Sequence, residues 1–261
     1  MHPELTRRHE TGMDLPVLVW RPVEPVLVVS SGALGGGIGI RHWVVNATVP
    51  MSYDRPDPPA HLAELAADRG LTGSGTGLLT GVDVASVVTV VEDGVVVSAT
   101  VGIGDPIWAA AAPSRAEAVG TINVVAWIPG RLGEAALVNA VATVAEAKAQ
   151  ALFELGIPGT GTCTDAVVLA CPTGGPASPY GGPRSAWGAP LARAVHAAVR
   201  RGGRAWLADP RSWSARYPAP SGGPGPDGES GAGRDPFRGH GGVRGSDRVR
   251  EDPSLGARTD T

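Results

Sequence analysis

The chain contains a single lysine, Lys148, and that lysine interrupts an apolar helical pattern. In the stretch ALVNAVATVAEAKAQALFELG the larger apolar side chains recur at steps of three, four or eight residues, and Lys148 fills the gap between Val144 and Leu152. An ammonium group on this face needs an acceptor from another element, because a buried charge without a partner is costly. The pattern indicates either a catalytic lysine or a structural one that binds loop carbonyls or reaches solvent.

The loop that follows this helix carries hydroxyl and carboxyl groups. It reads GIPGTGTCTD, and its alternating Thr160, Thr162 and Thr164 share one side of an extended chain, whereas Asp165 faces the other side. The glycines between them permit close approach of the backbone. Such a loop can cradle an oxyanion or a polar ligand, but a tight turn in which threonines bind the local backbone explains the same residues.

Two asparagines interrupt apolar strands, Asn46 in HWVVNATV and Asn123 in GTINVVAW. A buried amide without a partner costs about 1–3 kcal/mol, so each needs one. The partner is either the backbone or an amide of a substrate. On the Lys148 helix, Glu146 lies roughly 200° around the axis from the lysine, in a polar row that favours a solvated face.

A second glycine-rich loop, SSGALGGGIG, lacks the Lys-Ser/Thr ending of a P-loop and runs into a strand instead of a helix. Nucleotide binding is therefore only weakly supported. We expect this loop to lie at the rim of a substrate pocket, together with Ser185 and Trp187. The residues that it would contribute are Ser31, Gly35, Gly36 and Gly37.

Hydrophobic periodicity and turn signals predict strands and three main helices. Strands are expected at residues 25–30, 39–49, 86–104, 119–130 and in DAVVLACP, and the segment 86–104 is expected to form a hairpin that turns at Asp93-Gly94. Helices are expected in DRPDPPAHLAELAADRG, from Glu134 to Gly156 and in APLARAVHAAVRRGG. Paired strands mixed with helices predict an α+β fold, a single domain at residues 15–210 with a mixed or largely antiparallel sheet. Residues 217–261 are rich in Gly, Pro and Arg and lack an apolar period, which predicts a disordered tail.

Composition and charge exclude several function classes. The net charge is −3 and the arginines are scattered, which argues against a nucleic-acid partner. We find neither a membrane segment nor a secretory signal, so we expect a cytoplasmic protein with a reduced, buried Cys163 and Cys171. These cysteines do not form a CxxC motif and lack a nearby histidine cluster, so no metal site is expected. His61 and His196 fall on amphipathic helices and are interpreted as surface residues.

Several longer segments, taken in order, resemble the adenosylcobinamide amidohydrolase family over about residues 26 to 200. The segments are SSGALGGG, VVNATVPMSYDRPDPPAHLAELA, GLLTGVDV, ATVGIGDPIWA, GTINVV, LVNAVATVAEAKAQALFELGIPGTGTCTDAVVLACP and YGGPRSAWGAPLARAVHAAV. The resemblance implies hydrolysis of the amide that joins the corrin side chain to aminopropanol, which gives adenosylcobyric acid for cobamide (vitamin B12) salvage. It also implies a corrinoid substrate whose cobalt is not a cofactor of the protein, and it leaves the oligomeric state unknown.

Amide hydrolysis needs a base, donors for the tetrahedral oxyanion and an acid for the leaving amine. We expect Lys148, Asp165, Asn123 and Thr162 to supply these catalytic functions without a metal. The expected substrate-binding residues are Ser31, Gly35, Gly36, Gly37, Asn46, Glu146, Thr160, Thr164, Ser185 and Trp187. Two alternatives stay open. One is a corrinoid-binding protein that uses the same pocket without turnover, which would not need a buried lysine beside a carboxylate. The other is an autoprocessing hydrolase in which one threonine of GTGTCTD becomes the N-terminal nucleophile after cleavage of the chain.

Overall fold

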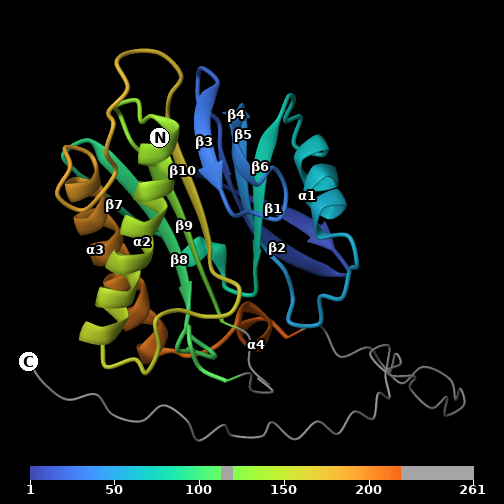
Figure 1. Cartoon of the computed structure of the whole chain (residues 1–261). Coiled ribbons are helices and arrows are strands. Elements are labelled where there is room, and N and C mark those ends of the chain that lie inside the picture. The colour runs from blue at the N-terminus through green and yellow to red at the C-terminus, as the bar shows by residue number, and fades with distance from the viewer. Residues whose placement is uncertain (113–119, 219–261) are drawn as a thin grey trace, which may run out of the picture. The chain divides into compact units, whose positions relative to one another are not determined.

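The computed structural model describes residues 1–112 and 120–218, and nearly all of the expected tail at 217–261 lies outside these ranges. The strands form two sheets that pack face to face, with helices on the outer face of each sheet (Figure 1). The layer between the sheets is mainly apolar, with Trp20 and Leu78 from one sheet and Val125 and Val168 from the other. Burial of these side chains holds the two sheets together.

The first sheet has four strands in the order β1-β2-β5-β6. Its first three strands are antiparallel neighbours, and β5 and β6 are parallel because helix α1 connects them. α1 buries Leu62 and Leu65 against the outer face of this sheet. The elements are β1 (Glu4–Glu10), β2 (Met13–Trp20), β5 (Trp43–Thr48), α1 (Pro58–Ala67) and β6 (Gly75–Thr80).

The second sheet has six strands in the order β4-β3-β10-β9-β8-β7. All neighbours are antiparallel except β9 and β10, which helix α2 connects. The predicted hairpin turns at Asp93 and Gly94, both with positive φ, as this type of turn requires. The strands are β3 (Val26–Ser30), β4 (Gly37–Arg41), β7 (Val88–Glu92), β8 (Val95–Gly102), β9 (Thr121–Trp127) and β10 (Ala166–Pro172).

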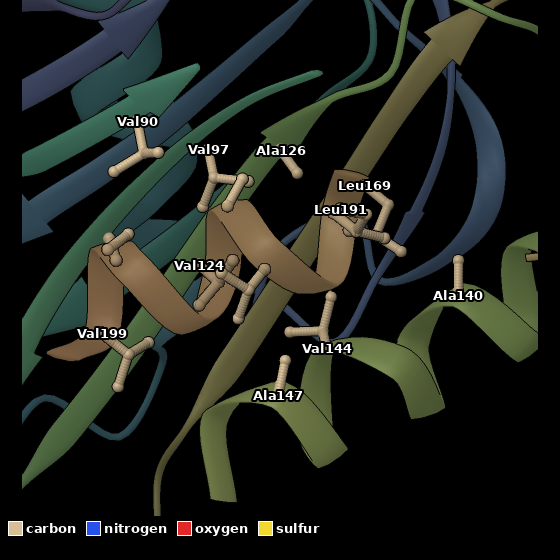
Figure 2. Packing of buried hydrophobic residues seen from close by; sticks show 14 of the residues in the cluster. Val90, Val97, Val124, Ala126, Ala140, Val144, Ala147, Leu169, Leu191 and Val199 are labelled. Carbon is tan, nitrogen blue, oxygen red and sulfur yellow. The ribbon is translucent and has the colours of Figure 1, made fainter. Parts of the chain in front are cut away.

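Helices α2 (Glu134–Glu154) and α3 (Gly188–Ala208) cover the outer face of the six-stranded sheet. Figure 2 shows Val144 on α2 and Leu191 on α3 among buried residues of the sheet such as Val124. Two shorter elements complete the described chain, a 3₁₀ turn at Val84–Ser86 and α4 (Trp213–Arg216).

The predicted α+β class with three main helices is confirmed, and the helix that carries Lys148 begins at Glu134 as expected. The strands, however, divide between two sheets, and β1 lies before the expected domain start at residue 15. Asp83 caps the short 3₁₀ turn by accepting a hydrogen bond from the Ala85 N–H at 3.0 Å.

His61 is not the surface residue that its amphipathic helix suggested, because only 2% of it is exposed. Its ring stacks on Tyr53, and its Nδ1 lies 3.1 Å from the Tyr53 hydroxyl. Its Nε2 lies 3.4 Å from Glu10, a residue of β1. The prediction was wrong because strand β1, which the sequence did not reveal, packs against this face of α1.

Candidate active site

Lys148 and Asp165 form an ion pair at one end of the six-stranded sheet. Lys148 lies on α2, and Asp165 directly precedes β10, so the loop between helix and strand brings the two together. Their side chains are only 16% and 13% exposed. The apolar stripe of α2 explains this placement, because packing that stripe on the sheet also buries the stem of the lysine.

Asp165 is saturated with hydrogen bonds. Its Oδ1 accepts from the Ile122 N–H at 2.8 Å and from the Thr162 hydroxyl at 2.5 Å. Its Oδ2 accepts from the Thr162 N–H at 3.1 Å and from the Lys148 ammonium group. Four donors occupy both oxygens of this carboxylate, so Asp165 is fixed in position and holds Lys148 in place.

Gly161 provides the room that this ion pair needs. A side chain at this position would collide with the Asp165 carboxylate and the Lys148 amine. The loop is fixed from its other side, since the Ile107 N–H donates to the Gly161 carbonyl at 2.8 Å and the Thr160 N–H donates to the Ile107 carbonyl at 2.8 Å. These backbone contacts clamp the loop against the ion pair.

The threonine hydroxyls of the loop bind within the protein. The Thr164 hydroxyl donates to the Gly120 carbonyl at 2.9 Å, and the Thr121 hydroxyl lies 2.7 Å from that of Thr164. The Thr162 hydroxyl lies within reach of both Asp165 and the Gly120 carbonyl, and the hydroxyl of Thr160 accepts from a backbone N–H at 3.2 Å. These contacts match the structural reading of the loop, in which threonines order a tight turn.

Two cavities meet at the ion pair. The smaller, of about 230 Å³, has Lys148, Asp165 and Ser31 beside mainly apolar walls. The larger, of about 450 Å³, shares Ser31, Asp165 and Ala166 with the smaller one and extends toward Thr121, Thr164 and the end of β6. The apolar wall residues of the smaller cavity are Ile122, Val124, Val141, Val144, Ala145 and Val167.

Asn46 and Asn123 bind each other between the two sheets. The Asn123 amide donates to the Asn46 carbonyl oxygen at 3.0 Å and to the Leu79 carbonyl at 3.2 Å, and the Asn46 amide donates to the Thr100 hydroxyl at 3.1 Å. Each asparagine is 1% exposed and lines neither cavity. On β9, Asn123 faces the opposite side from its neighbours Ile122 and Val124, which face α2, so the structure does not bring it to Lys148.

Ser185 and Trp187 also lie outside the two cavities. Ser185 stabilises the start of α3, since its hydroxyl donates to the Gly182 carbonyl at 2.8 Å and accepts from the Gly188 N–H at 3.0 Å. Trp187 packs close to Gly130, which precedes α2, whereas Lys148 lies in the last two turns of that helix. Of the residues expected at the rim, Ser31 and the loop before β10 line the two cavities, whereas Ser185 and Trp187 do not.

Glu146 and the glycines of the first loop are likewise separate from Lys148. Glu146 lines a different cavity between α2 and α3, as its angle around the helix indicated. The turn between β3 and β4 contains Gly35 and Gly37, both with positive φ, and Gly36 between them. None of the three glycines lines the two cavities at the ion pair.

The cysteines carry no sign of a metal or disulfide role. Both are free thiols, but Cys163 is exposed and only Cys171 is buried, which corrects the expectation of a buried pair. Burial raises the pKa of the Cys171 thiol. Within residues 1–112 and 120–218, no group of three or more His, Cys, Asp or Glu side chains is arranged to hold a metal ion.

In the same ranges, no helix combines the length and the apolar character needed to cross a membrane.

An ion-paired lysine at a mainly apolar cavity is the kind of site at which enzymes stabilise charge on a reacting amide. The model of the adenosylcobinamide amidohydrolase family matches residues 2–211, so the chain belongs to that family and is an amidohydrolase. The match begins at β1 and includes both sheets, which extends the resemblance seen in the sequence toward the N-terminus.

Two curated relatives carry the name adenosylcobinamide amidohydrolase. The one from Methanosarcina mazei is 35% identical over 153 residues, which are 58% of this chain and 73% of the relative. The one from Halobacterium salinarum is 39% identical over 117 residues, which are 41% of this chain and 48% of the relative.

Among solved structures, the chain is similar to the crystal structure of the PH0078 protein from Pyrococcus horikoshii OT3. The match has 10% sequence identity and a TM-score of 0.38, and it covers 77% of this chain and 81% of the other.

Proposed function

We propose that this protein hydrolyses the amide between the corrin side chain and aminopropanol of adenosylcobinamide, and so releases adenosylcobyric acid for cobamide salvage. Membership in the family gives the substrate its chemical identity. The observation that carries the chemistry is the ammonium group of Lys148, which Asp165 orients at a mainly apolar cavity. The proposed reaction uses no resident cofactor, and the cobalt belongs to the substrate.

Lys148 has N–H donors beyond the one that binds Asp165. In the proposed reaction water adds to the scissile carbonyl, and Lys148 stabilises the oxyanion that forms. The leaving nitrogen then takes a proton from Lys148, and the proton of the attacking water restores the ammonium group. The apolar walls strengthen these interactions, because charges attract more strongly where water is excluded.

A labelled hydrolysis experiment tests this function. Purified full-length protein is incubated with adenosylcobinamide in water enriched in oxygen-18, and the products are identified by mass. We expect adenosylcobyric acid with one heavy oxygen in its new carboxyl group, together with free aminopropanol. Recovery of unchanged adenosylcobinamide that co-elutes with the protein would instead indicate a corrinoid-binding protein without turnover.

A further inference from the structure

Ser31 stands at the junction of the two cavities at the ion pair. The cavity with Lys148 and the larger cavity share Ser31, Asp165 and Ala166 among their lining residues. A substrate that occupies both cavities lies against this junction, beside Lys148. The chemistry of Ser31 therefore bears on any group that lies beside the lysine.

The position of Ser31 is fixed although the residue is exposed. Its backbone N–H donates to the Val167 carbonyl at 3.0 Å, and its hydroxyl oxygen accepts from the Val167 N–H at 3.0 Å. These two bonds attach the residue to the start of β10, two residues after Asp165. A side chain held in this way pays little ordering entropy when it binds a ligand.

The hydroxyl hydrogen of Ser31 distinguishes it from the hydroxyls of the three threonines around Asp165. Thr164 donates to a backbone carbonyl, Thr121 pairs with Thr164, and Thr162 is occupied by Asp165 and the Gly120 carbonyl. The Ser31 hydroxyl accepts one bond, but its hydrogen has no acceptor in the part of the chain that the structure describes. It is therefore a positioned donor with a free hydrogen at the cavity.

We propose that Ser31 is a second catalytic residue, which donates its hydroxyl hydrogen to the carbonyl oxygen of the scissile amide. Lys148 and Ser31 line the same cavity from α2 and from the end of β3, so the two donors can bind one oxyanion between them. Donors fixed before the reaction stabilise developing charge without reorganisation, and the loss of one lowers kcat by about 10²- to 10³-fold. This inference rests on the proposed amide hydrolysis and assigns a role within it.

Three variants test Ser31. Ser31→Ala removes the donor, Ser31→Thr keeps a hydroxyl, and Ser185→Ala is the matched control because the Ser185 hydroxyl also accepts a backbone N–H at 3.0 Å but lines neither cavity. We expect kcat of Ser31→Ala to fall by about 10²-fold with KM changed little, whereas Ser31→Thr recovers most of kcat and Ser185→Ala keeps it.

The melting temperature and the fraction of folded protein are measured on the same preparations. A purely structural role for Ser31 predicts that Ser31→Ala melts at a lower temperature but keeps its kcat per folded molecule, and this result would overturn the inference. Rapid quenching with intact-mass analysis adds a second test. A covalent adduct of adenosylcobyric acid on the wild-type protein would show that the hydroxyl attacks the carbonyl instead of donating to it.

The two hypotheses fail differently. Wild-type protein that releases no aminopropanol contradicts the proposed function and the role of Ser31 with it. Wild-type protein that is active, together with an equally active Ser31→Ala, contradicts only the role of Ser31.

Discussion

In the described part of the chain, each sheet carries a cluster of largely buried charged groups, and the two clusters can be compared. The Lys148 cluster consists of Lys148, Asp165 and Thr162, and the His61 cluster consists of Arg8, Glu10, Tyr53 and His61. In the Lys148 cluster every lone pair of the carboxylate is occupied, and the cation lines a cavity.

In the His61 cluster the polar groups contact one another. The imidazole ring of His61 lies between Glu10 and Tyr53. Arg8 donates to Glu10 at 2.7 Å, Glu10 lies beside His61, and the His61 side chain is 3% exposed. Two guanidinium nitrogens of Arg8 are buried without a partner in the described part of the chain.

The comparison shows that buried charge alone does not identify an active site, because both clusters have it. What distinguishes Lys148 is that its charge is both oriented and presented to a cavity.

We expect the largest effect from removing the charge of Lys148. Lys148→Met keeps the volume of the stem, and we expect turnover to fall by at least about 10²-fold while the melting temperature changes little. Lys148→Arg should lose a similar amount, because a guanidinium group does not give up a proton and its wider fork does not fit the same acceptor. Turnover is normalised to folded protein, and Arg193→Met is the control because Arg193 pairs with Glu92 on the surface.

Near-normal turnover of Lys148→Met would exclude Lys148 as a catalytic residue. A destabilised fold with normal turnover in the folded fraction would place Lys148 with the His61 cluster, as a structural charge.

Gly161→Ala displaces the ion pair without removing either partner. The added methyl group collides with both partners, so the ion pair has to separate, and displacements of about 1 Å can cost up to 10²-fold in rate. We expect turnover to fall by about 10-fold or more, with a smaller loss of stability. Gly174→Ala is the matched control, since nothing lies within 4 Å of its added methyl group. Equal turnover of the two variants would show that the loop tolerates the change and that the ion pair is not needed in this geometry.

The His61 cluster should affect stability rather than turnover, and its effect should depend on pH. Burial lowers the pKa of His61 below its ordinary value of 6.5, although the Glu10 carboxylate acts in the opposite direction. The unfolded chain then binds more protons than the folded chain, so this contribution to stability is complete above pH 6.5. It is lost as the pH falls through the lowered pKa.

Melting curves over this pH range test the assignment. His61→Gln removes the titrating group, so we expect a flatter pH dependence than in the wild type, a stability loss of about 1 kcal/mol at neutral pH from the lost stacking on Tyr53, and unchanged turnover. Parallel pH curves for the two proteins would be inconsistent with a buried, neutral His61.

Local patterns predicted much of the fold. The apolar stripe gave the helix that begins at Glu134, and Asp93-Gly94 gave the hairpin between β7 and β8. Strand β6 was missed because its residues, GTGLLT, include glycines that disfavour strands, and β1 was missed because its residues are mostly charged or polar. Both strands depend on pairing with distant partners, which no local pattern contains.

The site shows the same limit. Lys148 was recognisable from the gap in its stripe, and Asp165 from its loop, but the backbone donors that fix Asp165 carry no signal in the sequence. Ser185 and Trp187 were expected at the rim of the pocket, whereas the structure places Ser185 at the start of α3. No local sequence pattern shows which loops meet at one cavity.

The crossover from β9 through α2 to β10 also bears on the order of folding. Lys148 and Asp165 are 17 residues apart, and Ile122, which donates to Asp165, precedes Lys148 on the same crossover. Contacts at short separation close small loops and form early, whereas contacts with distant segments form late. Ser31 is 136 residues from Val167. We therefore expect the ion pair to form earlier in folding than the contact that places the Ser31 hydroxyl.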